Sequence, residues 1–176
     1  MAFGLTYPQL KALNPCDEEF KSVVKTLGGA SKWNGNLMTA QMAREAGVSF
    51  DNIFWAASSV ARKDKEVERC LRHWMADCAA RVLHIYEKTA GADDRPRKAI
   101  EAARLYADGK MGAAAWDVAR AAARDAAWAA ARDVARDAAW DAEEAWQFDR
   151  LCRWLSDTPP EPLELPAPPK AKEGAD

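Results

Sequence analysis

The feature that most constrains this chain is an alanine-rich repeat of twelve residues in its C-terminal half. The first copy begins at Trp116 and the second at Trp128, and the two are identical at eight of twelve positions. A third, less regular copy begins at Trp140, and residues 113–157 contain neither glycine nor proline. Alanine loses almost no side-chain entropy in a helix, and nothing in this run interrupts one. The repeat therefore predicts helix over residues 113–156.

Length and period both argue against a single straight rod in this region. An α-helix turns ~100° per residue, so tryptophans twelve residues apart point in directions ~120° apart and cannot all contact one neighbour. One helix over residues 113–156 would be ~66 Å long, against a radius of gyration of ~16 Å for a compact chain of this size. We therefore expect a bend or break between Trp128 and Glu144. Alanine at every fourth position from Ala115 to Ala139 indicates closely packed helix backbones.

Capping residues and glycines divide the rest of the chain into further helices. Thr6 and Gln9 have the spacing of a capping box, and Thr39, Asp51, Asp64 and either Asp93 or Asp94 are predicted N-caps. No stretch alternates like a strand, so we predict an all-α fold of about seven helices in a single domain over residues 1–157. Its predicted parts are short helices over residues 1–62, a core helix over 64–90, a helix over 93–109 and the repeat over 113–156.

The core helix carries a regular apolar face. Its apolar residues recur every three or four positions, which is the pattern of a buried amphipathic helix. The predicted buried residues of this face are Val67, Leu71, Trp74, Cys78, Val82 and Ile85.

From Pro159 onward the composition changes. Six of the nine prolines lie in the last 18 residues, with few large apolar side chains. Such a segment buries too little surface to order itself. We expect residues 158–176 to form an extended, flexible tail.

Eight tryptophans in 176 residues suggest aromatic anchors in the core. Trp55 and Trp74 lie on apolar helical faces and are predicted core residues, and Trp33 is predicted to anchor a loop over residues 30–37. Trp146 and Trp154 either complete the core or form an exposed patch suited to protein binding.

Charge and hydropathy exclude several classes of protein. The chain has 25 basic and 27 acidic residues and a net charge of −2, which argues against a strongly basic nucleic-acid binder and against an acidic DNA mimic. The N-terminus lacks the layout of a signal peptide, and no apolar run reaches the ~18 residues of a membrane span. We expect a soluble cytoplasmic protein that binds neither membrane nor nucleic acid.

The cysteines do not indicate a disulfide framework. Cys16, Cys70, Cys78 and Cys152 contain no CxxC pair, and each lies within an apolar helical pattern. We predict reduced, buried thiols.

One cluster resembles a set of metal ligands. Cys70, His73, Asp77 and Cys78 lie on one predicted helix, but structural zinc sites bring paired ligands at tight spacing and no second pair exists. Buried thiols beside a partly exposed histidine explain the cluster better. A nucleophilic cysteine would need His73 or His84 as its base, and both lie on that same helix. We therefore expect no catalytic residue, metal site or cofactor, and no enzymatic activity.

Two groups of residues are candidates for binding. The first is a column along the repeat, and the second is a basic cluster of Arg95, Arg97 and Lys98 at a helix N-terminus, where a phosphate or carboxylate could bind. In the column along the repeat, neighbouring aspartates offset the arginine charges, which favours a solvated polar face. The alternative for this column is an arginine ladder that binds an anionic partner. The column consists of Arg120, Arg124, Trp128, Arg132 and Arg136.

The segment from Asp94 to Arg104, the turn at Gly109 and the alanine-rich helix that follows resemble the immunity-five-like domain family. In the N-terminal part, the segments Leu10–Cys16 and Asn52–Trp55 resemble small alanine-rich proteins of phages and prophages. The resemblance covers residues 6–156. It implies an all-helical, non-catalytic accessory protein of mobile elements or toxin–immunity systems.

This resemblance makes a protein partner the first expectation for function. We expect a phage or mobile-element protein that binds and blocks a bacterial effector, either a toxin or an antiviral defence component. Two alternatives stay open: a module that binds a small nucleotide-like anion, and a self-assembling protein whose repeat forms a homodimer seam.

Overall fold

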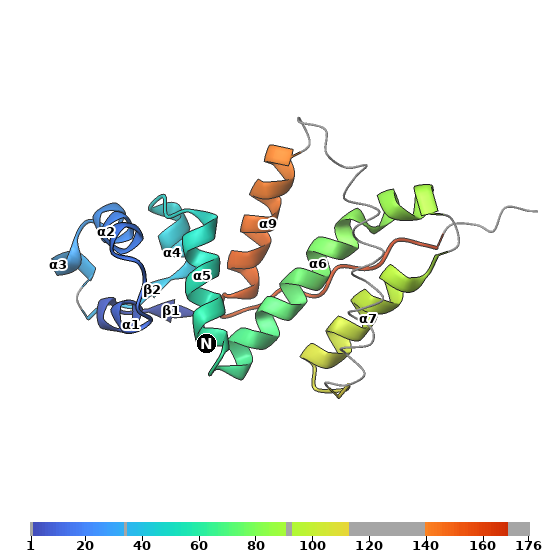
Figure 1. Cartoon of the computed structure of the whole chain (residues 1–176), viewed down its shortest axis with the longest axis horizontal. Coiled ribbons are helices and arrows are strands. Elements are labelled where there is room, and N and C mark those ends of the chain that lie inside the picture. Colours follow the sequence, from blue (N-terminus) through green and yellow to red (C-terminus); the bar gives the residue numbers. More distant parts are fainter. Residues whose placement is uncertain (1, 34, 91–92, 113–139, 169–176) are drawn as a thin grey trace, which may run out of the picture. The chain divides into compact units, whose positions relative to one another are not determined.

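A computed structural model describes residues 2–33, 35–90, 93–112 and 140–168 of the chain (Figure 1). Its described residues form eight helices and one two-stranded sheet, so the predicted all-α class is confirmed. The helices are α1 (Tyr7–Ala12), α2 (Asp17–Thr26), α3 (Ala30–Trp33), α4 (Ala40–Glu45), α5 (Phe50–Ala61), α6 (Lys65–Ala90), α7 (Arg95–Ala107) and α9 (Trp140–Trp154).

The chain divides into two compact units, and the single domain over residues 1–157 stays a prediction. Unit 1 comprises Met1–Leu71 and Trp146–Pro160, and unit 2 comprises Arg72–Ala145 and Glu161–Asp176. Helix α6 contributes its first turns to unit 1 and the rest to unit 2. The predicted bend or break in the repeat lies outside the described residues, apart from the start of α9.

A short β-ribbon in unit 1 was not predicted. Strand β1 (Gly4–Leu5) pairs antiparallel with β2 (Met38–Thr39), with Gly4 opposite Thr39. Two residues per strand are too few to produce the alternation that reveals a strand in sequence. A Cβ at Gly4 would lie 2.9 Å from the Met38 carbonyl oxygen and from Leu37 Cγ, so the close approach of the strands requires glycine.

Most predicted helix starts are confirmed by their hydrogen bonds. The Thr6 N–H donates to Gln9 Oε1 at 2.8 Å, Thr39 Oγ1 accepts from the Met42 N–H at 3.2 Å, and Asp64 Oδ1 accepts from the Glu66 N–H at 2.9 Å. These side chains satisfy N–H groups that have no partner within the helix.

The predicted cap of α5 is wrong. Ser49, not Asp51, is the N-cap, and its Oγ accepts from the Asn52 N–H at 3.4 Å. Asp51 lies instead in the first turn, where its negative charge favours the helix N-terminus. The predicted loop over residues 30–37 is also interrupted, because Ala30–Trp33 form the single turn α3.

The core of unit 1 is closed by the C-terminal half of α9. Leu151, Cys152 and Trp154 are buried, which decides for the core between the two alternatives left open for Trp154, and Leu151 is fully inaccessible to solvent. The chain beyond α9 is tied to the N-terminus, because the Phe3 N–H donates to the Leu155 carbonyl oxygen at 2.8 Å. Each buried aliphatic side chain of this size stabilises the fold by about 1.5–3 kcal/mol.

In unit 2, α6 packs on α7 through small side chains. A buried cluster joins Ala76, Ala80 and Leu83 of α6 to Ile100 and Ala103 of α7. Alanine at two successive turns lets the helix axes come close.

This packing corrects the predicted buried face of α6 in its second half. Val67, Leu71 and Trp74 are buried as predicted, whereas Val82 and Ile85 are only half-buried. The face that contacts α7 combines Leu83 with alanines and polar residues, a mixture that the large apolar side chains of the sequence did not reveal.

The C-terminal segment is extended as far as residue 168, and part of it packs on the core, which the expected flexible tail did not include. Leu163 and Leu165 pack against the cluster between α6 and α7, and the Leu163 N–H donates to Asp77 Oδ1 at 2.9 Å. Figure 1 shows this segment running beside α6 and α7. Two leucines among prolines are enough to hold it, because proline has little conformational entropy to lose.

No helix in the described ranges combines the length and the low charge that a membrane crossing requires.

Candidate functional site

A row of charge pairs joins α6 to α7 in unit 2. His73 Nε2 lies 2.9 Å from Asp108 Oδ1, and Arg104 Nη2 donates to Asp77 Oδ1 at 2.9 Å. Near the C-terminus of α6 and the N-terminus of α7, Arg97 binds Glu87 through three hydrogen bonds of 2.7–3.0 Å. All of the α6 partners are buried. The row fixes the register of the two helices, because a shift of either one would leave buried charges unpaired.

Asp77 is the centre of this row. Its side chain is inaccessible to solvent, and its Oδ1 accepts from both Arg104 and the Leu163 N–H. A buried carboxylate needs such partners, because an unpaired charge in the interior costs several kcal/mol. Asp77 thus joins α6, α7 and the C-terminal segment.

The same contacts bear on the predicted metal-like cluster. His73 is 3 % exposed, which corrects the expectation of a partly exposed side chain. Both His73 and Asp77 face residues of α7. The part of the chain that the structure describes contains no group of three His, Cys, Asp or Glu side chains that could hold a metal ion.

Asp108 at the end of α7 has a shifted pKa. Burial opposes ionisation, but hydrogen bonds from Lys110 and His73 outweigh it and lower the pKa of Asp108 below 3.8. The carboxylate is therefore the stable form beside His73.

The basic cluster at the start of α7 is locally neutralised. Arg95 Nε and Nη2 donate to Asp93 at 2.8 and 2.7 Å, and Lys98 Nζ lies 2.7 Å from Asp94 Oδ2. Arg97, whose side chain is 16 % exposed, is bound to Glu87. The Arg95 hydrogen bonds, with one from Tyr86, hold the pKa of Asp93 well below its ordinary value. An anionic ligand would have to displace these carboxylates, which disfavours the predicted anion site.

The first predicted binding group cannot be placed. Arg120, Arg124, Trp128, Arg132 and Arg136 lie outside the described residues.

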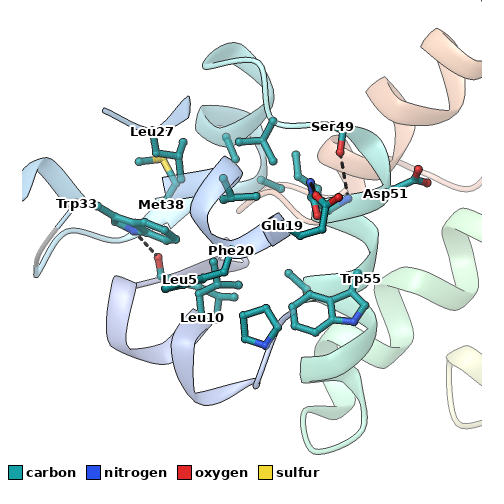
Figure 2. A pocket seen from close by; sticks show the side chains of 18 of the residues that line it. Leu5, Leu10, Glu19, Phe20, Leu27, Trp33, Met38, Ser49, Asp51 and Trp55 are labelled. Atoms are coloured by element: carbon teal, nitrogen blue, oxygen red, sulfur yellow. Dashed lines mark hydrogen bonds between the residues drawn. The ribbon is translucent and has the colours of Figure 1, made fainter. Parts of the chain in front are cut away.

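Unit 1 contains a feature that sequence reasoning missed, a half-open cavity of about 400 Å³ (Figure 2). Figure 2 shows Leu10, Phe20 and Trp33 around it, from α1, α2 and α3. The remaining walls come from the β-ribbon, α4 and α5. No sequence signal marks this cavity, because its lining residues are scattered over residues 3–56 and read individually as ordinary core positions.

One side of the cavity is polar. Glu19, Ser49, Asp51 and Asn52 line it, and Asn52 Nδ2 donates to Glu19 Oε2 at 3.0 Å. Trp55 also lines the cavity and is 38 % exposed, so its prediction as a core residue is wrong. Its position one turn after Asn52 directs the indole to the cavity rather than to the core.

The four cysteines are free thiols, but they are not all buried. Cys70 and Cys152 are buried, Cys78 is half-buried and Cys16 is exposed beside the start of α2. Burial raises the pKa of Cys70, and it raises that of Cys152 to about 11. The buried thiols are therefore unreactive.

The charge row, unlike the cavity, left a readable signal. Consecutive predicted helices carry His73, Asp77 and Glu87 on the first, and Arg97 and Arg104 on the second. Opposite charges in reversed order on two neighbouring helices are typical of an antiparallel pair. In the sequence, His73 and Asp77 resembled metal ligands and Arg97 an anion site, and no contact between the helices was predicted.

Comparison with protein families matches residues 58–143 to the model described as Imm-5 like putative immunity protein. A search of curated proteins gives no match, and a search of solved structures gives none either. The matched range contains α6, α7 and the charge row between them, and it includes the segment Asp94–Arg104 on which the resemblance was based. The predicted range, residues 6–156, was wider than the match. Residues 58–143, just under half of the chain, are thus similar to the Imm-5 like putative immunity protein family.

Proposed function

We propose that this protein is a non-enzymatic binding protein of a phage or similar mobile element. It acts in the bacterial cytoplasm, where it blocks an effector protein, either a toxin or a component of antiviral defence, by occupying its active or assembly surface. The match to a family of immunity proteins carries the proposal. Immunity of this kind requires a protein partner.

The chemistry of the matched helices supports binding rather than catalysis. Catalytic groups need freedom to exchange protons or to reach a substrate. In α6 and α7 the buried ionisable side chains are held in pairs such as Asp77–Arg104 and Glu87–Arg97. These pairs make the two helices a rigid support for a contact surface.

A stripe on the outer side of α7 fits such a surface. Exposed residues recur at the spacing of one helical face, and among them Leu105 is a large apolar side chain that is 40 % exposed. An exposed apolar side chain surrounded by charged residues is a common arrangement at protein interfaces. The stripe consists of Asp94, Lys98, Glu101 and Leu105.

The other predicted binding residues take different places in the proposal. Arg97 serves the fold, because it is bound to the buried Glu87. Arg95 stays a candidate partner residue, since its side chain is 56 % exposed beside Asp93. The column of Arg120, Arg124, Trp128, Arg132 and Arg136 also stays a prediction.

Co-expression tests the proposal. Each gene adjacent to this one is expressed alone and with this protein in a bacterial host, and growth is recorded. We expect one neighbour whose toxicity this protein suppresses and which co-purifies with it. If no neighbouring product is toxic and suppressed, and none binds at micromolar concentration, the proposal is wrong.

Variants locate the surface in the same assay. Leu105→Glu should weaken protection, whereas the control Leu37→Glu, an equally exposed leucine in unit 1, should not. The pair Arg124→Glu and Arg132→Glu tests the predicted arginine column.

A further inference from the structure

The cavity in unit 1 has no place in the proposed function. Its lining residues fall between Phe3 and Ala56, whereas the match to the immunity family begins at residue 58. The N-terminal segment therefore adds something that the matched helices lack. We propose that this cavity binds a small molecule with an apolar body and a positively charged group.

The size of the cavity indicates a ligand rather than a packing defect. Protein interiors are close-packed, with few voids larger than a water molecule, whereas ligand cavities measure roughly 300–1,000 Å³. A volume of about 400 Å³ lies in the second class. The large apolar residues Phe3, Leu5, Phe20 and Met38 line it and remain only half-buried. A bound apolar group would cover this surface.

The walls are fixed before any ligand binds. The Trp33 indole N–H donates to the Leu5 carbonyl oxygen at 3.0 Å, as drawn in Figure 2. The Tyr7 ring lies 5.4 Å from the Phe20 ring and 5.8 Å from the Trp33 ring, measured between centroids. A site that is already formed loses little entropy on binding.

The charges of the lining residues select a cation. Among the described residues that line the cavity, Glu19 and Asp51 are acidic and none is basic. The Glu19 carboxylate is held by Asn52, which lies one helical turn before Trp55 on α5. Residues three apart share a helical face, so the carboxylate and the exposed indole lie at the same part of the rim. A carboxylate beside an indole face attracts an organic cation.

Calorimetric titration of the full-length protein with three compounds that carry a chain of ten carbons tests this proposal. Decyltrimethylammonium, decanol and decanoate differ in charge, and each is used below its micellar concentration or, for decanol, below its solubility limit. We expect decyltrimethylammonium to bind with the highest affinity, decanol less tightly and decanoate least. Substituting both rim acids, Glu19→Gln with Asp51→Asn, should weaken cation binding by about threefold to tenfold and leave decanol unchanged.

Matched variants separate the cavity from general surface binding. Glu18→Gln removes the neighbouring charge on α2 that does not line the cavity, and it should leave all affinities unchanged. Val23→Phe places a larger side chain in the cavity and should abolish binding. Val24→Phe, at a half-buried position outside the cavity, should not. Circular dichroism of each variant shows whether it folds. If Val23→Phe does not fold, the substitutions at the exposed Glu19 and Asp51 still test the proposal.

Three titration results would overturn the proposal. These are no binding of any compound up to the highest concentration at which it stays dissolved as single molecules, equal binding of the cationic and anionic compounds, and cation binding that the two rim substitutions leave unaltered. None of these three results bears on growth protection, so the proposed function stands or falls separately. Binding of a peptide from the effector in place of the small cation would also overturn the proposal for the cavity.

Discussion

Substitution of Asp77 tests the charge row most strongly. In Asp77→Ala, the Arg104 guanidinium, whose side chain is only 16 % exposed, loses its carboxylate, and the Leu163 N–H loses its acceptor. Removing one partner of a buried ion pair costs about 3–5 kcal/mol. We expect a loss of that size in the free energy of unfolding, measured by urea denaturation followed by circular dichroism.

A double substitution separates the charge pair from simple loss of packing. Asp77→Leu with Arg104→Met replaces both charges by apolar groups of similar size, and such replacements are often neutral. The Leu163 N–H then still lacks its acceptor, at a cost of about 1–3 kcal/mol. The double variant should therefore be more stable than Asp77→Ala. The surface control Glu101→Ala should change stability by less than about 0.5 kcal/mol.

Two outcomes would refute this reasoning. One is a loss below about 1 kcal/mol for Asp77→Ala, which would mean that the carboxylate is not buried and paired as described. The other is a double variant whose loss equals the sum of the losses measured for Asp77→Leu alone and for Arg104→Met alone, because independent sites add and coupled sites do not.

Three further predictions concern single groups. Ser49→Ala should lower the free energy of unfolding, measured by urea denaturation, by about 1 kcal/mol. Ser49→Asn should leave it nearly unchanged, because both serine and asparagine cap helices well. Equal losses in the two variants would contradict the capping role of Ser49. Iodoacetamide at pH 8 should modify the exposed Cys16 first and Cys152, with its pKa of about 11, only after unfolding, as read by mass spectrometry. The folded pKa of Asp108 lies below the ordinary 3.8, so its contribution to stability is complete above that pH and is lost as the pH falls through the folded value. Asp108→Asn should therefore reduce the loss of unfolding free energy between neutral pH and pH 3. The same dependence of stability on pH in the variant and the unaltered protein would contradict a lowered pKa of Asp108.

Local signals in the sequence were sufficient for the helices. The Thr6, Thr39 and Asp64 caps act over three residues or fewer, so a short window of sequence contains both partners of each hydrogen bond. The error at Ser49 shows the limit of this approach. Both Ser49 and Asp51 have side chains that can cap a helix. Contacts with the surrounding structure decide which of the two residues lies outside the helix.

Contacts between distant segments could not be predicted in the same way. The burial of Leu163 depends on a groove that exists only once α6 and α7 have packed, and composition alone indicated a free tail. Trp55 was misassigned for a similar reason, since an apolar helical face can line a cavity as well as a core. The cavity requires the joint placement of six elements, which no single periodicity encodes.

The stoichiometry of inhibition tests most directly whether this protein inhibits its effector by binding. The effector that this protein neutralises is assayed for activity after mixing with increasing amounts of the protein, at concentrations above their dissociation constant. Inhibition by binding predicts that activity falls linearly, reaches its minimum at a fixed molar ratio of the two proteins, and does not change with longer incubation. Complete inactivation by far less than an equimolar amount, progressing with time, would show turnover and would contradict the account.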